Sequence, residues 1–573
     1  PTAGAATATT AAQDLGPPMR TFALPQRAQS ATAAVATAHP LATRAATGAL
    51  FRGGSAVDAL VAASLVLSVV TPHSTGIGGG GFAIVVPPTG VATAWDFREA
   101  APMAGQLADY LGDDGKPVAE RSQRHGLAVG VPGYVAGLWA LHQRYGKRPW
   151  AELCTPAIDA AARGFAIGSA LEDAAKWAWD DLDASAKALL APGEKRLVAG
   201  DVLRQPALAA TLRAIAKDGA DGFYRGAVAE DLAATVQRHG GKLTQRDLAA
   251  YAVREVEPLR GVAFGFDVLT MPQPSAGGAQ LLAMAEFLAD ASAKVRKVQK
   301  RKPVADADAD QPDAATAHAV LEAMRASFLL RLAFSGDVEV PAKTLDDVYP
   351  AKARRTLRAA FSTAKATPSE RIAVVGEKHE NTSHVSIVDS EGMAVSSTHT
   401  VNLLFGAGIV GDRSGVWLNN ELDDFAFAED TSNAFGLAGS KANLFRPGAR
   451  PVSSMTPTVF RDKSGVRLVV GAPGGTRIPT TVLLVAWRYL ALHQPLVAAV
   501  AAPRMHHQAF PDEAWLEPEG AALWQEGLQA RGHTVKIKQP WCNIQAVGVG
   551  RAPGALTYEA VADPRGEGGA MGL

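Results

Sequence analysis

The segment from Asn381 to Phe425 carries side chains that could do chemistry. It places Thr382 at the head of an expected strand, and follows it with a hairpin, a Gly-rich turn and a cluster of amides and carboxylates. A threonine hydroxyl is a poor nucleophile at neutral pH unless a base lies beside it. Attack on an amide also creates an oxyanion, which fixed N–H donors must stabilise. Further along, Gly474-Gly475 could supply two such donors, because no side chain keeps a substrate away from them.

Short strands are expected around these residues, because the sequence pattern changes from helical to strand-like after Thr382. SHVSIVD and AVSSTHTV are β-rich runs joined by Ser390-Glu391-Gly392, as in a hairpin. Further strands are expected at GVWLN, PTVF and VRLVVGAP, before a helix around residues 480–493. Thr400 lies on the second strand of the hairpin and could return beside Thr382, although threonine is also a common strand residue.

The first half of the chain has mainly helical patterning, which begins near Ala34. Gly53-Gly54 ends one helix, and Ser55 can cap a second helix whose apolar run is too short to span a bilayer. A four-glycine run at residues 78–81 then leads into an apolar strand. Neither a repeat nor a Pro/Gly linker divides the chain. We therefore predict one large α/β unit, although the length alone would suggest several domains.

Two segments differ in composition from this unit. Residues 1–33 are small and polar, with no apolar signal region, so we expect a disordered leader left after processing, or simply an irregular terminus. Residues 294–313 run from a basic stretch into an acidic one, so their charges cancel. We interpret this segment as a solvated insertion loop in preference to a nucleic-acid or partner arm.

The composition excludes several classes of protein. The 56 Lys+Arg residues balance 56 Asp+Glu, which argues against a general nucleic-acid binder. With 47% hydrophobic residues, the chain is not intrinsically disordered. Its two cysteines can form neither a disulfide framework nor a thiolate zinc site alone. The sequence contains no P-loop, dinucleotide fingerprint or G-x-S-x-G elbow.

Two histidine pairs could suggest a metal site. His379 and His384 are five residues apart, so they would not share a helix face. The adjacent His506-His507 would point its rings to different faces of a regular element. We therefore predict structural roles for both pairs, and neither a metal nor another cofactor.

The order of these pieces resembles that of the gamma-glutamyltranspeptidase family, within the N-terminal nucleophile hydrolases. The similarity extends over most of the chain and comprises GGSAVDA, the four-glycine run, DFREAAP at residues 96–102, the block 382–425, PVSSM, GAPGG, APRMHHQ and ADPR. It implies an α/β (α+β) fold, a four-layer αββα sandwich. Both products of a self-cleaved precursor would build it, a large subunit at 34–381 and a small subunit at 382–573.

The resemblance makes Thr382 the nucleophile. Cleavage of the Asn381–Thr382 bond would give Thr382 a free α-amine, with a pKa of about 7.7–8.0, that can act as the base for its own hydroxyl. In the family, the same hydroxyl first attacks the preceding carbonyl, so the precursor cuts itself. Similarity further implies a hydrogen bond from Thr400 to the oxygen of the nucleophile, and an oxyanion hole formed by Gly474 and Gly475.

A γ-glutamyl group carries a free α-amine and a free α-carboxylate, and a specific site must pair both. The positions that match the carboxylate-binding set of the family are Arg98, Ser453 and Ser454. Those that match the ammonium-binding set are Asn402, Glu421 and Asp424. The expected activity is cleavage of glutathione and related γ-glutamyl amides, with transfer to water, an amino acid or a peptide. The resemblance also implies a periplasmic or secreted protein.

Four positions depart from the pattern of some relatives. Glu421 stands where some bacterial members carry glutamine and animal members glutamate. Phe435, in a lid-like segment, stands where some bacterial members carry a tyrosine, and a phenyl ring cannot donate a hydrogen bond. Leu403-Leu404 replaces threonines, which would make the acceptor side more apolar.

Four alternatives remain open from the sequence. A glutaryl-cephalosporin acylase of the same family would act on a substrate without the α-amine. The intact ammonium-binding set argues against this alternative. A poly-γ-glutamate depolymerase would use the same bond and is harder to exclude. A catalytically silent binding protein belongs to a different class, and the intact Thr382, Thr400, Arg98 and glycine pair weigh against it. A metal hydrolase that uses the histidines is the remaining option.

Overall fold

The computed structural model describes residue 19 and residues 26–299, 311–339, 341–369, 382–428, 441–552 and 555–573. The predictions for Asn381, His379, Phe435 and the centre of the 294–313 insertion lie outside the described residues.

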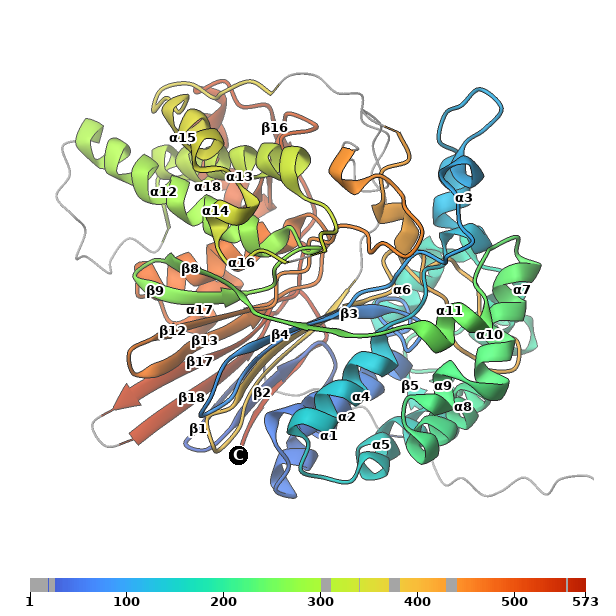
Figure 1. Cartoon of the computed structure of the whole chain (residues 1–573). Coiled ribbons are helices and arrows are strands. Elements are labelled where there is room, and N and C mark those ends of the chain that lie inside the picture. The colour runs from blue at the N-terminus through green and yellow to red at the C-terminus, as the bar shows by residue number, and fades with distance from the viewer. Residues whose placement is uncertain are drawn as a thin grey trace, which may run out of the picture.

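Two seven-stranded sheets lie against each other at the centre of the molecule (Figure 1). All their pairings are antiparallel. The first sheet has the order β19 (Gly569–Gly572), β2 (Ala34–Thr37), β10 (Ser383–Val388), β11 (Ala394–Thr400), β3 (Gly80–Val86), β4 (Thr93–Phe97) and β7 (Arg254–Val256). The second has the order β1 (Arg27–Ser30), β18 (Ala555–Ala562), β17 (Gln545–Ala552), β13 (Gly465–Gly471), β12 (Thr458–Asp462), β9 (Phe266–Thr270) and β8 (Leu259–Ala263).

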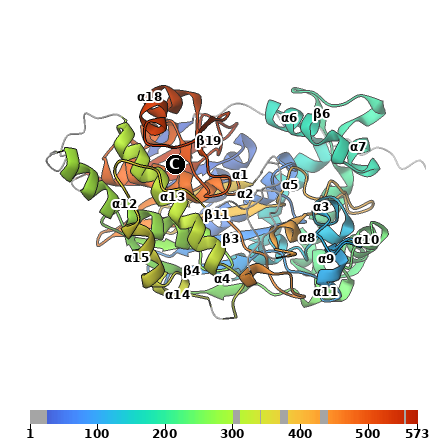
Figure 2. The ribbon, with the colours of Figure 1, turned by 90° about the horizontal axis from the view of Figure 1, so that it is seen from above.

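Helices cover the outer face of each sheet, and the views in Figures 1 and 2 separate the two groups. The helices on the side of the first sheet are α1 (Pro40–Phe51), α2 (Ala56–Val70), α4 (Tyr134–Tyr145) and α5 (Trp150–Arg163), with α8 (Pro206–Asp218), α9 (Asp221–Tyr224), α10 (Gly226–Arg238) and α11 (Gln245–Ala250) beyond them. Those on the side of the second are α12 (Gly277–Gln299), α13 (Ala314–Phe334), α14 (Leu345–Val348), α15 (Ala351–Ala359), α16 (Arg477–Ala486), α17 (Leu496–Ala501) and α18 (Pro518–Gln529). The predicted four-layer αββα sandwich is therefore confirmed.

Smaller elements lie outside the two seven-stranded sheets. They are α3 (Ala119–Gln123), α6 (Ser169–Trp177), α7 (Ala184–Leu190), the pair β5 (Phe165–Ala166) and β6 (Val202–Leu203), and the small sheet of β14 (Met505–His506), β15 (Ala514–Leu516) and β16 (Val535–Ile537).

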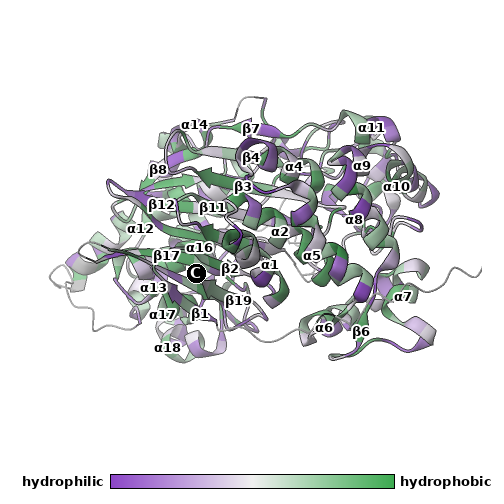
Figure 3. Cartoon of the chain, turned by 90° about the horizontal axis from the view of Figure 1, so that it is seen from below, coloured by the Kyte–Doolittle hydropathy of each residue, from purple (hydrophilic) through white to green (hydrophobic). Residues whose placement is uncertain are grey.

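Helix α2 shows how the sequence fixes a buried layer. Ser55 caps its N-terminus in a reciprocal capping box with Asp58, as its sequence predicts. Every residue of the helix is buried, because α2 lies between the first sheet and the outer helices. Figure 3 shows the same hydrophobic colouring along α2 and the central strands. Among the described residues, no helix combines the length and the apolar character needed to cross a bilayer.

Three local predictions were wrong. Arg27–Ser30, placed in a disordered leader, forms β1 and pairs with β18, because backbone hydrogen bonds can hold an edge strand that has few apolar side chains. Ala34–Thr37, expected to be helical, is strand β2, which is buried throughout and so shows no alternation. GVWLN contributes only an isolated bridge between Val410 and Trp417.

Candidate active site

The hairpin of β10 and β11 brings Thr382 towards Thr400. The register pairs Ser383 with His399, and continuing it by one residue places Thr382 opposite Thr400. Thr382 is only 6% exposed, and both threonines line one pocket. The Thr400 Oγ1 accepts a hydrogen bond from the Asn402 backbone N–H at 2.8 Å, so its own hydroxyl proton is directed to another acceptor.

The four-glycine run allows the backbone to approach this hairpin closely. A Cβ at Gly79 would lie 2.0 Å from the Thr400 carbonyl oxygen. A Cβ at Gly80 would lie 2.6 Å from a carboxylate oxygen of Glu99. Neither distance is compatible with a side chain, so the glycines are required by packing at the end of β11 and beside Glu99.

The pocket encloses about 330 Å³ of space, including solvent at its mouth. It brings together nine predicted residues: Arg98, Thr382, Thr400, Asn402, Glu421, Asp424, Ser453, Ser454 and Gly475. Gly474 precedes Gly475 in the chain but does not itself line the pocket. Met455 and Ile478 complete the lining. Sequence reasoning missed both, because a methionine and an isoleucine carry no chemical signal of their own.

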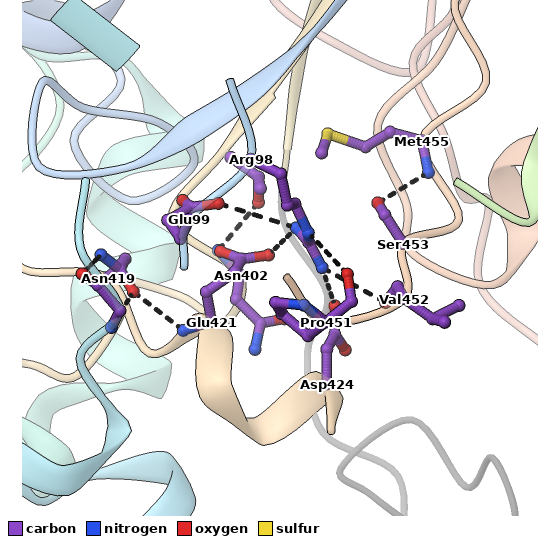
Figure 4. Close-up of polar contacts among 12 residues, drawn as sticks. Arg98, Glu99, Asn402, Asn419, Glu421, Asp424, Pro451, Val452, Ser453 and Met455 are labelled. Atoms are coloured by element: carbon purple, nitrogen blue, oxygen red, sulfur yellow. Dashed lines mark hydrogen bonds and ion pairs between the residues drawn. The ribbon is translucent and has the colours of Figure 1, made fainter. Parts of the chain in front are cut away.

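A buried ion-pair network fixes Arg98 at the centre of this wall (Figure 4). Arg98 follows β4 and is 1% exposed. Its guanidinium donates to Glu421 and, over 2.5 Å, to Asp424, while Glu99 lies 3.9 Å away. It also donates to the backbone carbonyls of Pro451 and Val452 at 3.2 and 3.3 Å. The two sets of opposite charge predicted from the sequence therefore pair with each other within the protein.

Amide side chains hold the carboxylate side of the network. The Asn419 Oδ1 accepts the backbone N–H of Glu421 at 3.0 Å, and its Nδ2 donates to the carbonyl of Gly78 at 2.8 Å (Figure 4). Asn402 has a φ of 78° and donates to the Asn420 carbonyl at 2.9 Å. The sequence singled out Asn402 but not Asn419, which does not line the pocket.

Burial shifts the acidity of this carboxylate group. Burial raises the pKa of Glu421 to about 7; Arg98 opposes this shift and Asp424 adds to it. Burial also raises the pKa of Asp424, again opposed by Arg98. The pKa of Glu99 lies well above its ordinary value because of burial and the neighbouring Glu421. The sequence did not mark Glu99 as a separate site residue, although it lies inside DFREAAP.

The two pocket serines are held by different partners. The Ser453 Oγ accepts the backbone N–H of Met455 at 3.1 Å. The Ser454 Oγ accepts a hydrogen bond from Arg331 of α13 at 2.7 Å. Because each oxygen already accepts a bond from the protein, each hydroxyl proton remains the donor for another group.

The glycine pair forms the turn between β13 and α16. Gly474 has a φ of 120° and Gly475 a φ of 51°, and α16 begins at Arg477. A Cβ at Gly474 would lie 2.2 Å from the Cys542 Sγ, so the turn excludes side chains on steric grounds as well. The Gly475 backbone faces the pocket next to the end of the hairpin.

The described histidines of both candidate pairs have structural roles. His384 is buried and bonds to the hydroxyls of Thr398 and Ser386 at 2.8 and 3.0 Å. His506 bonds to Thr480 at 2.9 Å, and burial lowers its pKa to about 3. His507 turns to Asp512 instead, at 3.3 Å. The two adjacent histidines thus have different partners.

Another cluster, His318, Glu322 and His533, has the residue types of a metal site. Here the His318 Nε2 donates to the Ser362 carbonyl at 2.7 Å, so its Nδ1 accepts a hydrogen bond from the His533 Nε2–H, also at 2.7 Å. Glu322 accepts the backbone N–H of Thr367 at 3.0 Å. Protein hydrogen bonds therefore account for this cluster.

Leu403 does not line the pocket in the described part of the chain. It is 1% exposed and packs with Phe328, Ala509 and Phe510. Leu404 belongs to the core beneath the first sheet. Leu403 and Leu404 thus fill the protein interior.

Comparison with known proteins places this geometry in a family. The gamma-glutamyltranspeptidase family profile matches residues 42–573. The glutathione hydrolase proenzyme of Escherichia coli is 36% identical over 540 residues, 93% of this chain and 90% of that protein. The corresponding proenzyme of Pseudomonas aeruginosa is 37% identical and covers 93% of each. The chain belongs to the gamma-glutamyltranspeptidase family.

Solved structures agree with this family assignment. The gamma-glutamyltranspeptidase of Helicobacter pylori is 33% identical, with a TM-score of 0.52 over 58% of this chain and 92% of that one. The cephalosporin acylase of Bacillus halodurans superposes with a TM-score of 0.80 over 96% of this chain and 97% of that one. Its identity is 23%, so this match supports the shared fold only.

Proposed function

We propose that this gamma-glutamyltranspeptidase family member hydrolyses or transfers the γ-glutamyl group of glutathione and related amides, with Thr382 as nucleophile. The observation that carries the proposal is one pocket in which Thr382 shares a wall with a guanidinium, two serines and two carboxylates. A neutral acyl group would gain nothing from buried charges of both signs.

The charge arrangement fits a zwitterion. Within the protein, Arg98 pairs with Glu421 and Asp424. A γ-glutamyl group offers its ammonium to the two carboxylates and its α-carboxylate to Arg98, Ser453 and Ser454, so each buried charge keeps a partner of opposite sign. Leaving any of them unpaired would be costly, which makes the site selective for a ligand with both charges.

The reaction begins when the Thr382 Oγ1 attacks the γ-carbonyl carbon and its proton passes to the α-amine of the same residue. Backbone N–H groups at Gly474-Gly475 stabilise the oxyanion, and Thr400 donates to the Thr382 oxygen. Collapse of the intermediate breaks the C–N bond, and the ammonium proton moves to the leaving amine. Water or an acceptor amine then attacks the ester and releases Thr382.

A free amine at Thr382 requires cleavage before this residue. The proposal therefore includes a precursor cut between Asn381 and Thr382, into a large subunit that includes strand β1 and ends at Asn381 and a small subunit of 382–573. Two strands from the C-terminal piece, β10 and β11, lie between β2 and β3 from the N-terminal piece. The two subunits would thus remain one fold after cleavage. A periplasmic or secreted location and a lid role for Phe435 complete the proposal. Residues 294–299, expected in a solvated loop, instead belong to helix α12.

The two family alternatives differ in how they use the ammonium site. A glutaryl group lacks the α-amine, so it would leave Glu421 and Asp424 paired with Arg98 and unused. Poly-γ-glutamate would present the same amide bond, and the contacts of the γ-glutamyl group do not separate it from glutathione.

Intact-mass measurement of purified protein tests the mechanism. The wild type should give two chains split before Thr382, Thr382→Ala a single chain without activity, and Thr382→Ser, which keeps a hydroxyl, two chains. Release of p-nitroaniline from γ-glutamyl-p-nitroanilide, with and without glycylglycine, separates transfer from hydrolysis. A Thr382→Ala protein that still turns over this substrate would refute the proposal. Equal turnover of glutaryl-p-nitroanilide would favour the acylase instead.

A further inference from the structure

We propose that Arg331 is a positioning residue that makes the pocket select a charged α-carboxylate, acting through Ser454. This inference rests on the proposed γ-glutamyl substrate. Arg331 lies on α13, is 6% exposed, and is not among the residues that line the pocket. Its hydrogen bonds therefore reach a ligand only through the residue that it holds.

The contacts of Arg331 converge on the serine pair. Its Nη1 donates to the Ser454 Oγ at 2.7 Å and lies 3.4 Å from the Ser453 carbonyl oxygen. The same nitrogen lies 3.5 Å from the Gln280 Oε1 of α12, which is fully buried. The guanidinium is thus bonded to the backbone and the side chain of the segment that forms the proposed carboxylate-binding wall.

The direction of the Arg331–Ser454 bond decides what Ser454 can do. A guanidinium has donors and no acceptor, so the Ser454 oxygen must accept. The hydroxyl proton is then available only for a different acceptor, and the pocket presents it to a ligand. A hydroxyl that receives a charged donor is also polarised, which strengthens the bond that it donates. The arrangement favours a ligand that brings an anionic oxygen and disfavours one that brings an N–H donor.

The charge of Arg331 acts in the same direction. Burial raises the pKa of Asp424, and the charges of Arg98 and, more weakly, of Arg331 oppose this rise, so the field of Arg331 reaches the centre of the pocket. Together with Arg98, Arg331 gives the carboxylate side a second positive charge behind the serines. Replacing the α-carboxylate of a substrate by a carboxamide removes the negative charge, and its NH₂ group opposes the Ser454 proton.

The test compares two substrates in six proteins. The substrates are γ-glutamyl-p-nitroanilide and its analogue in which the α-carboxylate is a carboxamide. The proteins are the wild type, Arg331→Met, Arg331→Lys and Ser454→Ala, with the double variant Arg331→Met/Ser454→Ala to complete the cycle. Arg325→Met is the matched control. Arg325 is another buried arginine of α13, but it pairs with Glu322 at 3.3 Å, away from the serines.

We expect the ratio of kcat/KM between carboxylate and carboxamide substrates to fall at least tenfold in Arg331→Met, through KM more than kcat. Lysine retains the charge and one donor, so Arg331→Lys should recover part of the ratio. Relative to Ser454→Ala, the double variant should lose less selectivity than Arg331→Met loses relative to the wild type, because part of the effect of Arg331 passes through that hydroxyl. Arg325→Met should keep the wild-type ratio, whatever its stability.

Three results would overturn the inference. Arg331→Met could lower kcat/KM equally for both substrates, or its effect could persist in full in the Ser454→Ala background. If Arg331→Met does not fold, an Arg331→Lys protein with an unchanged ratio and unchanged KM would be as decisive. A wild-type enzyme inactive on both substrates would instead refute the proposed function, and is distinguishable from these outcomes.

Discussion

Replacing Arg98 by glutamine should affect both substrate binding and stability, and the two effects have different pH dependence. Arg98 is 1% exposed and contacts Glu421 and Asp424 directly. Removing one member of a buried ion pair costs about 3–5 kcal/mol, because the remaining charge is left without a partner. The variant should therefore lose about this much unfolding free energy at pH 8, above the pKa of about 7 of Glu421.

The loss should shrink as the pH falls. The pKa of Glu421 is already raised to about 7, and the pKa values of Asp424 and Glu99 are raised as well. Without the guanidinium these folded-state pKa values rise further above the unfolded ones. Folding then takes up protons, so the variant is stabilised by acid, and its deficit should diminish from pH 8 to pH 5. Urea unfolding at several pH values measures this difference.

The effect on catalysis should persist at every pH at which the variant is folded. Arg98 is the proposed guanidinium partner of the α-carboxylate, and two charge-assisted hydrogen bonds contribute about 3–5 kcal/mol together. The expected loss in kcat/KM on γ-glutamyl-p-nitroanilide is thus roughly 10²- to 10³-fold. Arg98→Lys keeps the charge without the bidentate geometry, so its kcat/KM should lie between those of the wild type and Arg98→Gln.

Arg450→Gln provides the matched control. Arg450 is 4% exposed and pairs with Asp96 at 2.7 Å, but it does not line the pocket. It should lose stability with little loss of kcat/KM in protein that remains folded. An Arg98→Gln enzyme within threefold of the wild-type kcat/KM, or one whose stability deficit grows in acid, would refute this reasoning.

Two further predictions concern the carboxylate side of the pocket. Because the pKa of Glu421 is about 7, the site loses negative charge below that pH, and kcat/KM should fall there. In a profile from pH 5.5 to 8.5, Glu421→Gln should make this acidic limb less steep. An unaltered limb would contradict the assignment. Gly80→Ala should lose about 1–3 kcal/mol in urea unfolding, because its Cβ would lie 2.6 Å from the Glu99 carboxylate. Gly48→Ala, in helix α1, meets only the flexible end of Arg52 and should be neutral or stabilising; equal losses for both variants would refute the steric explanation.

The candidate site was largely predictable because its residues are marked by type and by order along the chain. A threonine at the head of a strand, a glycine pair after an apolar strand, and an arginine beside two acidic positions are local features. The members that were missed act from outside these motifs. Arg331 lies in a helix that is buried for much of its length, where one arginine in the sequence looks like any other.

Errors in the fold have a common physical origin. Strand β2 is buried on both faces, so the alternation that would distinguish it from a helix is absent. Strand β1 has partly exposed side chains and depends on its hydrogen bonds to β18, more than five hundred positions away in the sequence. Pairing over such a distance leaves no local trace.

By itself, the sequence determined the nucleophile candidate, the two sets of opposite charge and the family to which they belong, because each depends on residue type and chain order. Only the tertiary structure decided how these charges meet. It showed that Arg98 pairs with Glu421 and Asp424, that burial raises the pKa of Glu421 to about 7, and that Arg331 donates a hydrogen bond to the Ser454 hydroxyl oxygen. Hydrogen-bond direction and desolvation depend on distances between segments far apart in the chain, and only folding sets those distances.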